Sequence, residues 1–254
     1  MKQVIRLTAA TMFMLAVLQT HAGVVIESTR VIYPASDREV TVKLANKGST
    51  PVLVQAWLDN GEVEASPTKI AVPFILTPPI FRMEPDKGQA LRLRYTGEPL
   101  ARDKETMFWL NVLEVPPKDK AVAEASAVHM VIRTRIKVLF RPENLPGKAQ
   151  DAPAKLAWSI VRDGTGYALK ASNAAPYFVN LGAVSLNVAD KHFDAGQGYI
   201  APHGAEYFPI KAMTSAQGAG AEVEYSSLDD RGESKENKKE IAIDGPIVER
   251  PPPE

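Results

Sequence analysis

The residue types that most often carry out catalysis or bind metal ions are scarce in this sequence of 254 residues. It has no cysteine and four histidines, at positions 21, 129, 192 and 203, which is too few for the thiolate and imidazole clusters that hold transition metals. The Gly-x-Ser-x-Gly, His-Glu-x-x-His and Gly-Lys-Ser/Thr motifs do not occur. The adjacent acids Asp229 and Asp230 are more typical of a solvated turn than of a catalytic pair. The sequence therefore predicts no enzymatic activity, no cofactor and no metal site.

The overall charge gives no reason to expect a polyanionic partner. Thirty Lys and Arg residues balance thirty Asp and Glu residues, so the chain has no net field that would attract nucleic acid or an anionic surface. We therefore expect no nucleic acid partner.

One segment has a spacing suited to protein recognition. In the run Ala127–Arg135, the side chains of Val128, Met130 and Ile132 fall on one face of an extended strand, because successive residues of a strand point to opposite faces. The opposite face is mixed and basic. Such an apolar face either covers the core of its own domain or is offered to another chain, and the alternation alone fits both.

The elements that position this segment are predicted to be β-strands. Short alternating runs such as Glu39–Leu44, Val52–Leu58 and Leu91–Tyr95 end at turns rich in Gly, Asn and Asp, and the chain contains 20 prolines. Strands at this spacing favour β-sandwiches, so we expect an all-β protein.

The N-terminus has the pattern of a secretory signal peptide. Lys2 and Arg6 form a basic start, Leu7–Leu18 is apolar, and Thr20–Ala22 offers small residues for cleavage. We expect residues 1–22 to be removed and the mature chain to begin at Gly23.

The remaining length fits two domains of about 100 residues each. Two prolines and a glycine in Arg141–Gly147 interrupt an apolar run and mark a bend. We assign residues 23–144 to the first domain, 145–245 to the second, and 246–254, which are polar and rich in proline, to a flexible tail.

The segment Leu100–Pro117 resembles the signature of the PapD-like periplasmic pilus (fimbrial) assembly chaperones of the chaperone–usher pathway. In that family a charged turn with a glutamate leads into an aromatic strand, an asparagine follows, and a double proline closes the strand. The matching residues here are Glu105, Phe108, Trp109, Asn111, Pro116 and Pro117. Further matches follow in the same order as in the family: Thr29–Arg30, Gln55–Trp57, Thr77–Pro79, Arg82, Glu84–Pro85 and Arg135–Pro142.

The resemblance implies a fold and a function. The fold is two immunoglobulin-like β-sandwich domains set at a boomerang-like angle, and the location is the periplasm. The function is that of a chaperone that binds pilus subunits and delivers them to an outer-membrane usher. Val128, Met130 and Ile132 would form the donor strand, which adds to the edge of a subunit that lacks its last strand and fills its groove, a process called donor-strand complementation.

The resemblance also assigns Arg30 and Lys137 to the cleft between the domains, where they would hold the C-terminal carboxylate of the subunit. Two cations that converge on one carboxylate form charge-assisted hydrogen bonds and fix its register. Strict alternation places Lys137 on the face opposite Met130 and Ile132, so we expect a bulge, a strong twist or a change of exposure between them.

Three further charged residues are implied to lie between the domains and to hold their angle, namely Glu105, Arg141 and Asp230. Asp229 is an alternative to Asp230, and Arg92 is another candidate partner.

Two questions stay open from the sequence. The alternative function is an exported structural or adhesive β-sandwich protein of the cell surface. Within the chaperones, three apolar donor positions resemble the short-loop group, while the fairly long segment Lys118–Ser126 leaves the subfamily undecided.

We also expect the free form to self-associate, because apolar strand edges tend to pair.

Overall fold

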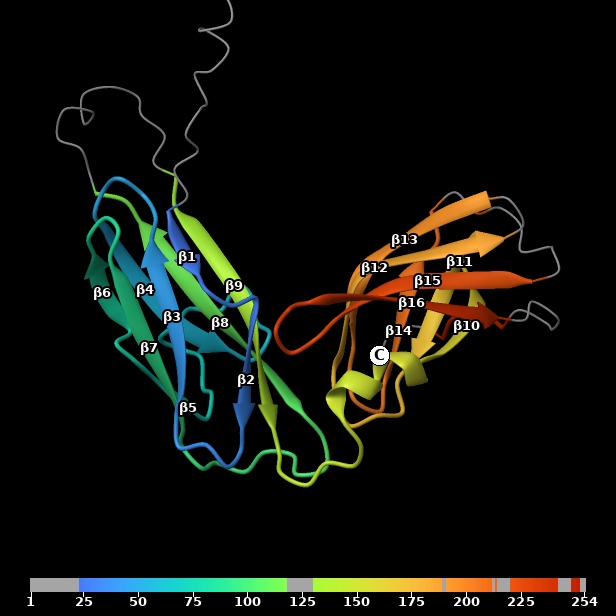
Figure 1. Ribbon diagram of the computed structural model, residues 1–254, viewed down its shortest axis with the longest axis horizontal. Helices are drawn as coiled ribbons and strands as arrows, with labels where there is room; N and C mark the ends of the chain where they lie inside the picture. Colours follow the sequence, from blue (N-terminus) through green and yellow to red (C-terminus); the bar gives the residue numbers. More distant parts are fainter. Residues whose placement is uncertain are drawn as a thin grey trace, which may run out of the picture.

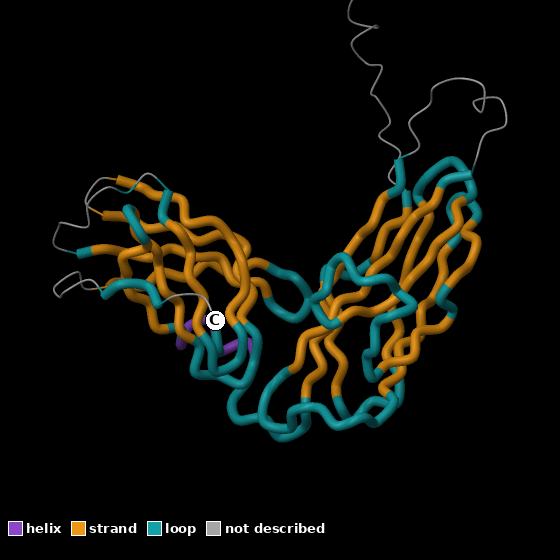
Figure 2. The backbone as a smooth tube through the Cα atoms, turned by 180° about the vertical axis from the view of Figure 1, so that it is seen from behind, coloured by secondary structure: helices purple, strands orange, loops and turns teal. Residues whose placement is uncertain are grey.

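The computed structural model describes residues 23–117, 130–188, 191–211, 213, 220–241 and 248–251. These residues form two β-sandwich domains that are joined at one end and diverge from there, so that the molecule has the outline of a V (Figures 1 and 2). The predicted all-β fold of two sandwiches at an angle is confirmed. No helix in the described ranges is long and apolar enough to cross a membrane.

The first domain is built from two facing sheets of antiparallel and parallel strands. One sheet has the order β1-β3-β7-β5 and the other the order β2-β9-β8-β4-β6. The strands are β1 (Val24–Ile26), β2 (Arg30–Pro34), β3 (Val40–Asn46), β4 (Val52–Asp59), β5 (Phe74–Thr77), β6 (Ile80–Met83), β7 (Gly88–Tyr95), β8 (Thr106–Val115) and β9 (Ile132–Arg141).

Alternation of side chains produces the core between these two sheets. Val42 and Leu44 of β3 are buried, whereas Thr41 and Lys43 before and between them are exposed. Leu110 and Val112 of β8 are buried in the same way. The ring of Tyr33 is fully buried and packs within 5.4 to 6.5 Å of three other aromatic rings, measured between centroids. Because one face of β8 and of β9 packs into this core, the opposite face of each strand points toward the second domain.

The second domain is a smaller sandwich with a separate core. Its sheets have the orders β10-β11-β14 and β13-β12-β15-β16, and Trp158, Leu186 and Tyr225 are among the buried residues between them. Its elements are two short 3-10 turns, η1 (Ala149–Asp151) and η2 (Pro153–Lys155), and the strands β10 (Ala157–Asp163), β11 (Gly166–Ser172), β12 (Val179–Val188), β13 (Lys191–Ile200), β14 (Ala205–Pro209), β15 (Ala221–Leu228) and β16 (Ser234–Ile241).

Part of the predicted flexible tail is held on the edge of this sandwich. The N–H of Arg162 in β10 donates to the carbonyl of Val248 at 2.9 Å, and the N–H of Arg250 donates to the carbonyl of Arg162 at 2.8 Å. Arg250 also forms an ion pair of 3.0 Å with Asp163. Residues 248 and 250 thus contact the edge strand β10, whose free backbone groups supply partners that the sequence pattern does not reveal, while the flexibility of the tail stays a prediction.

Candidate functional site

The first half of β9 has an open edge. Antiparallel pairing to β8 covers Ile132 to Phe140 on one side of β9, but on the other side β2 pairs, in parallel, only with Lys137 to Arg141. Within the described part of the chain, the backbone from Ile132 to Ile136 has no strand on that second side. Its N–H and C=O groups are a template for another strand.

Large apolar side chains lie at the start of this open edge. Met130 is 71% exposed and Ile132 is 49% exposed, whereas Ile136 and Val138, which follow on the same face of β9 as Ile132, are buried in the core of the first domain. Val128, the third predicted donor position, lies outside the described residues. The apolar face of β9 thus continues past the core of its own domain into solvent.

Of the bulge, strong twist or change of exposure expected between the donor positions and Lys137, a bulge is absent from Ile132 onward. The ladder between β8 and β9 runs from Ile132 to Phe140 without a register shift. Lys137 therefore lies on the face opposite Ile132, as simple alternation requires. No bulge is needed, because that opposite face is the one that looks toward the second domain.

Arg30 and Lys137 lie next to each other where the first domain contacts the second. They are direct partners in the parallel ladder between β2 and β9. The ammonium Nζ of Lys137 donates to Oδ1 of Asn180 in β12 at 2.6 Å and lies 4.3 Å from the ring centroid of Tyr199 in β13. The guanidinium Nη1 of Arg30 donates to the carbonyl of Leu228 at 3.0 Å. Both domains thus contribute to the surroundings of this pair.

The two cations lack an anionic partner in contact. No carboxylate of the described residues lies within 4.0 Å of either side chain, and Nε of Arg30 is buried without a hydrogen-bond partner there. Burial, and to a lesser extent the charge of Arg30, together lower the pKa of Lys137 to about 8. Burial also lowers the pKa of Arg30, which the more distant charges of Asp230 and Asp229 partly offset. An anion placed between the two would reverse both effects.

Arg141, four residues further along β9, is by contrast fully paired. Its Nε donates to Oε1 of Glu105 at 2.6 Å, and its two terminal nitrogens donate to the carboxylate of Asp230 at 2.7 and 2.8 Å. The other oxygen of Glu105 accepts the N–H of Phe178 at 2.7 Å. Glu105 is 3% exposed, and burial raises the pKa of its carboxyl although the charge of Arg141 acts against that rise. Burial alone would lower the pKa of Arg141, but the hydrogen bonds of Asp230 and the charge of Glu105 raise it instead.

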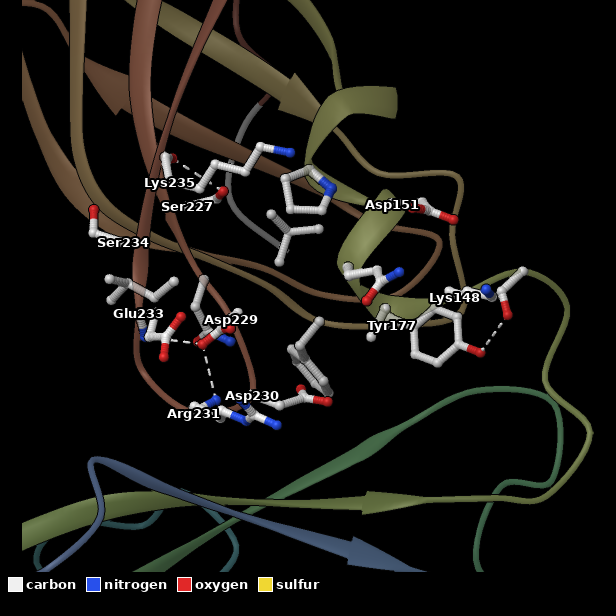
Figure 3. A pocket seen from close by; sticks show the side chains of 18 of the residues that line it. Lys148, Asp151, Tyr177, Ser227, Asp229, Asp230, Arg231, Glu233, Ser234 and Lys235 are labelled. Atoms are coloured by element: carbon white, nitrogen blue, oxygen red, sulfur yellow. Dashed lines mark hydrogen bonds between the residues drawn. The ribbon is translucent and has the colours of Figure 1, made fainter.

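The structure separates the two neighbouring aspartates. Asp230 reaches the first domain through Arg141, while Asp229 turns back into its own hairpin between β15 and β16 and accepts the N–H groups of Arg231 and Glu233 at 2.9 and 2.8 Å (Figure 3). Arg92, the other candidate partner, lies on β7 with its Nε 4.0 Å from Glu39. Of the candidates raised from sequence, Glu105, Arg141 and Asp230 are the ones brought together.

A second ionic network, missed in the sequence, lies beside the open edge of β9. The carboxylate of Asp59 is fully buried and bonds to Arg135 and to Nδ2 of Asn111, the latter at 2.7 Å. Oδ1 of Asn111 accepts Nε and Nη2 of Arg133 at 2.9 and 2.7 Å. The guanidinium groups lie over indole rings, 5.0 Å from the centroid of Trp57 for Arg133 and 4.2 Å from that of Trp109 for Arg135.

The pocket drawn in Figure 3 is lined mostly by the second domain, with Arg141 of β9 also in its wall, and it does not contain the cationic pair. It has a volume of about 840 Å³ and opens between η1, the start of β12 and the hairpin of β15 and β16. Lys148 and Lys235 line it together with Asp151 and Glu233, so its walls carry both signs of charge. No single ligand class is indicated by that mixture.

Both domains match families of known proteins. Residues 23–146 match the family described as "Pili and flagellar-assembly chaperone, PapD N-terminal domain", and residues 151–239 match "Pili assembly chaperone PapD, C-terminal domain". The chain is 38% identical to the probable fimbrial chaperone YadV of Escherichia coli (strain K12) over 83% of this chain and 87% of that protein. It is 40% identical to the chaperone protein FimB/FhaD of Bordetella pertussis over 83% of this chain and 85% of that protein.

Solved structures agree with these similarities. The crystal structure of the YadV chaperone superposes with a TM-score of 0.75 at 34% identity, covering 87% of this chain and all of that one (100%). The SafB chaperone of Salmonella enterica, solved in complex with the SafA pilin, superposes with a TM-score of 0.68 at 28% identity, covering 87% of this chain and 96% of that one.

Proposed function

We propose that this chain acts in the periplasm, where it binds pilus subunits by donor-strand complementation and delivers them to an outer-membrane usher. The chain belongs to the PapD family of pilus assembly chaperones. Its relatives are fimbrial chaperones, and SafB was solved bound to a pilin. The family relationship favours this role over that of an exported structural or adhesive protein. The absence of enzymatic activity stays a prediction, as does self-association of the free form.

The observation that carries the proposal is the open edge of β9 with its exposed apolar side chains. A subunit strand that pairs with residues 132–136 would satisfy the free backbone groups, while Met130 and Ile132 would enter the subunit's groove. Full burial of these two side chains contributes roughly 3 to 6 kcal/mol of gross transfer free energy, before the costs of association and ordering. Val128 would extend the same row.

The cationic pair supplies the register. A subunit carboxylate between Arg30 and Lys137 would receive charge-assisted hydrogen bonds, including one from the unpartnered Nε of Arg30. Lys137 is five residues beyond Ile132, so the anchor lies about 17 Å from the start of the open edge at the usual strand rise. This separation would allow only one alignment of the subunit strand to satisfy both ends.

The ionic network of Asp59, Asn111, Arg133 and Arg135 holds the first half of β9 in an extended conformation that can pair with another strand. Arg133 and Arg135 connect the first half of β9 to Asn111 of β8 and Asp59 of β4. All of these contacts are on the face toward the cleft, so they hold the strand extended without covering its open edge or its apolar face. We assign a positioning role to Asp59 on this basis.

The test is co-expression with a candidate pilus subunit, followed by co-purification. We expect the wild-type chain to keep the subunit soluble, and both Lys137→Glu and Ile132→Asp to lose the complex. Lys43→Glu, on the exposed face of β3 in the other sheet, is a matched control that should retain it. The proposal fails if Lys137→Glu binds a subunit as well as the control does, or if no candidate subunit forms a complex with the wild type.

A further inference from the structure

A carboxylate at the end of β8 is directed at the predicted mature N-terminus. The N–H of Val24 donates to Oε2 of Glu114 at 2.8 Å. A Cβ added at Gly23 would overlap both carboxylate oxygens of Glu114. The carbonyl of Gly23 accepts the N–H of Lys47 at 3.0 Å, so the first residue of the first domain is held from two sides.

Glu114 has no cationic side-chain partner in this position. None of the ion pairs found among the described residues includes it. The Glu114 side chain is only half-buried, and among the described residues its one hydrogen bond comes from the backbone N–H of Val24. A carboxylate in this environment can accept a second donor, and a cationic donor would be favoured.

We propose that Glu114 is the binding site of the α-ammonium group of Gly23, which is created when the first 22 residues are removed. A leader peptidase would hydrolyse the bond between Ala22 and Gly23 with one water molecule, leaving a carboxylate on Ala22 and an amine on Gly23 that takes up a proton. The inference thus rests on the predicted cleavage site. Standard backbone dimensions place the nitrogen of Gly23 within roughly 5 Å of the Glu114 oxygens, close enough to bond once the peptide link is cut.

Glycine at position 23 is what allows the contact. A side chain there would collide with the Glu114 carboxylate, which would have to rotate away and give up its bond to Val24. Without a side chain, the ammonium nitrogen of Gly23 and the next backbone N–H can both face one carboxylate. The uncleaved precursor has an uncharged amide at the same position and forms at most a neutral contact.

The location connects this ion pair to the donor strand. Glu114 is the direct partner of Ile132 in the ladder between β8 and β9, while β1, which begins at Val24, belongs to the opposite sheet. The pair would therefore clamp the two sheets of the first domain together beside Ile132, where the open edge of β9 begins. Cleavage of the leader would thereby stabilise the start of the donor segment.

The surrounding charges make the effect of Glu114 separable. On the neighbouring elements, Lys47 follows β3 and Lys87 precedes β7, and the carbonyl of Lys87 bonds to Asn46, the ladder partner of Val24. Both lysines are cations, which disfavour a charged amine nearby. Asp86, whose N–H donates to the carbonyl of Asn46 at 2.9 Å, is an acid of the same turn, so a raised pKa of the Gly23 amine is attributed to Glu114 when Glu114→Gln abolishes it and Asp86→Asn does not.

The experiment begins with the exported protein, whose first residue is read by mass spectrometry, and continues with an NMR titration of the Gly23 nitrogen. We expect a start at Gly23 and an amine pKa about one unit above the ordinary value of about 8. Glu114→Gln should return the pKa to the ordinary range, whereas Glu27→Gln, an exposed acid just after β1, should leave it raised.

Amide exchange provides the second readout. Exchange at Ile132 should become several-fold faster in Glu114→Gln and in a form with one extra alanine before Gly23, which keeps Glu114 but moves the ammonium. The extended form keeps the test decisive if Glu114→Gln folds poorly. A different first residue, or an amine pKa that is equal in the wild type and Glu114→Gln, overturns the inference; neither result bears on subunit binding at β9.

Discussion

Two clusters of buried charge lie on the same face of β9, four residues apart, and their electrostatics are opposite. Arg141 is enclosed by the carboxylates of Glu105 and Asp230, and its pKa is raised. Lys137 lies beside another cation, Arg30, with a neutral amide as its hydrogen-bond partner, and its pKa is lowered to about 8.

The difference separates a structural role from a binding role. We infer that the charges that find their partners within the chain hold the two domains at their angle. Charges that are buried beside one another without an anion destabilise the free protein and are favourable only when a ligand supplies the missing charge. We therefore propose that the cluster around Arg141 holds the domains together and that Arg30 and Lys137 bind the anion of a ligand.

Removing the paired cation should have the largest effect. Arg141→Ala would leave Glu105 buried against the N–H of Phe178 without its cation, and breaking such a buried pair costs about 3 to 5 kcal/mol. We expect the free energy of unfolding to fall by this amount in denaturant titrations. Arg82→Ala, which removes an ion pair that is largely exposed, should change it by less than about 1 kcal/mol. Equal losses in the two variants would contradict the structural role of Arg141.

Removing the unpaired cation should weaken binding while sparing the fold. Lys137→Met should reduce the affinity for a pilus subunit by about 2 to 5 kcal/mol, the usual cost of deleting one partner of a desolvated charge pair. Isothermal titration or surface binding measurements with a purified subunit would show this. The same variant should unfold at equal or higher denaturant concentration than the wild type. A clear loss of stability would mean that Lys137 is already compensated within the chain.

The lowered pKa of Lys137 predicts how stability depends on pH. Between about 8, its value in the folded chain, and 10.5, its ordinary value, the unfolded chain binds more protons than the folded one, so stability contributed by this group rises with pH. The full difference would correspond to about 3 kcal/mol, and solvent screening of this partly exposed ammonium reduces the expected gain to about 1 kcal/mol. It should appear as the difference between the wild type and Lys137→Met in unfolding experiments across this range. A difference that does not change with pH would contradict it.

The smallest expected effect is a difference in amide exchange rate between the two halves of β9. Arg133→Ala would remove the bonds to Asn111 and the stacking on Trp57, at a cost of about 1 kcal/mol. Amide exchange should accelerate in residues 132–136, which have one neighbouring strand, and little in residues 137–141, which also pair with β2. Uniform acceleration along β9 would show that Arg133 acts on the whole domain instead.

The sequence predicted the fold and the grouping of the interdomain charges because both follow from local patterns and from a dense match. Alternating runs specify sandwich strands, and the resemblance named Glu105, Arg141 and Asp230, which the structure brings into contact. The choice between Asp229 and Asp230 could not be made, because it depends on the direction in which each side chain leaves a hairpin turn.

Other features required the three-dimensional arrangement. Asp59 follows a strand-like run and precedes Asn60 and Gly61, so the pattern assigned it to a turn, and its burial under Arg135 depends on pairing between distant strands. A bulge, a strong twist or a change of exposure near Lys137 was expected because the sequence did not reveal that the face opposite the apolar donor positions borders the second domain. Asn180 and Tyr199 carry no signal in the sequence for their contact with Lys137.

The central claim, that the cationic pair awaits the carboxylate of a subunit, can be tested most directly by measuring the pKa of the Lys137 ammonium with NMR in the free chaperone and in its complex with a pilus subunit. The account predicts a pKa near 8 in the free protein and a value above 10.5 once the carboxylate is bound. A pKa that is the same in both states would contradict it.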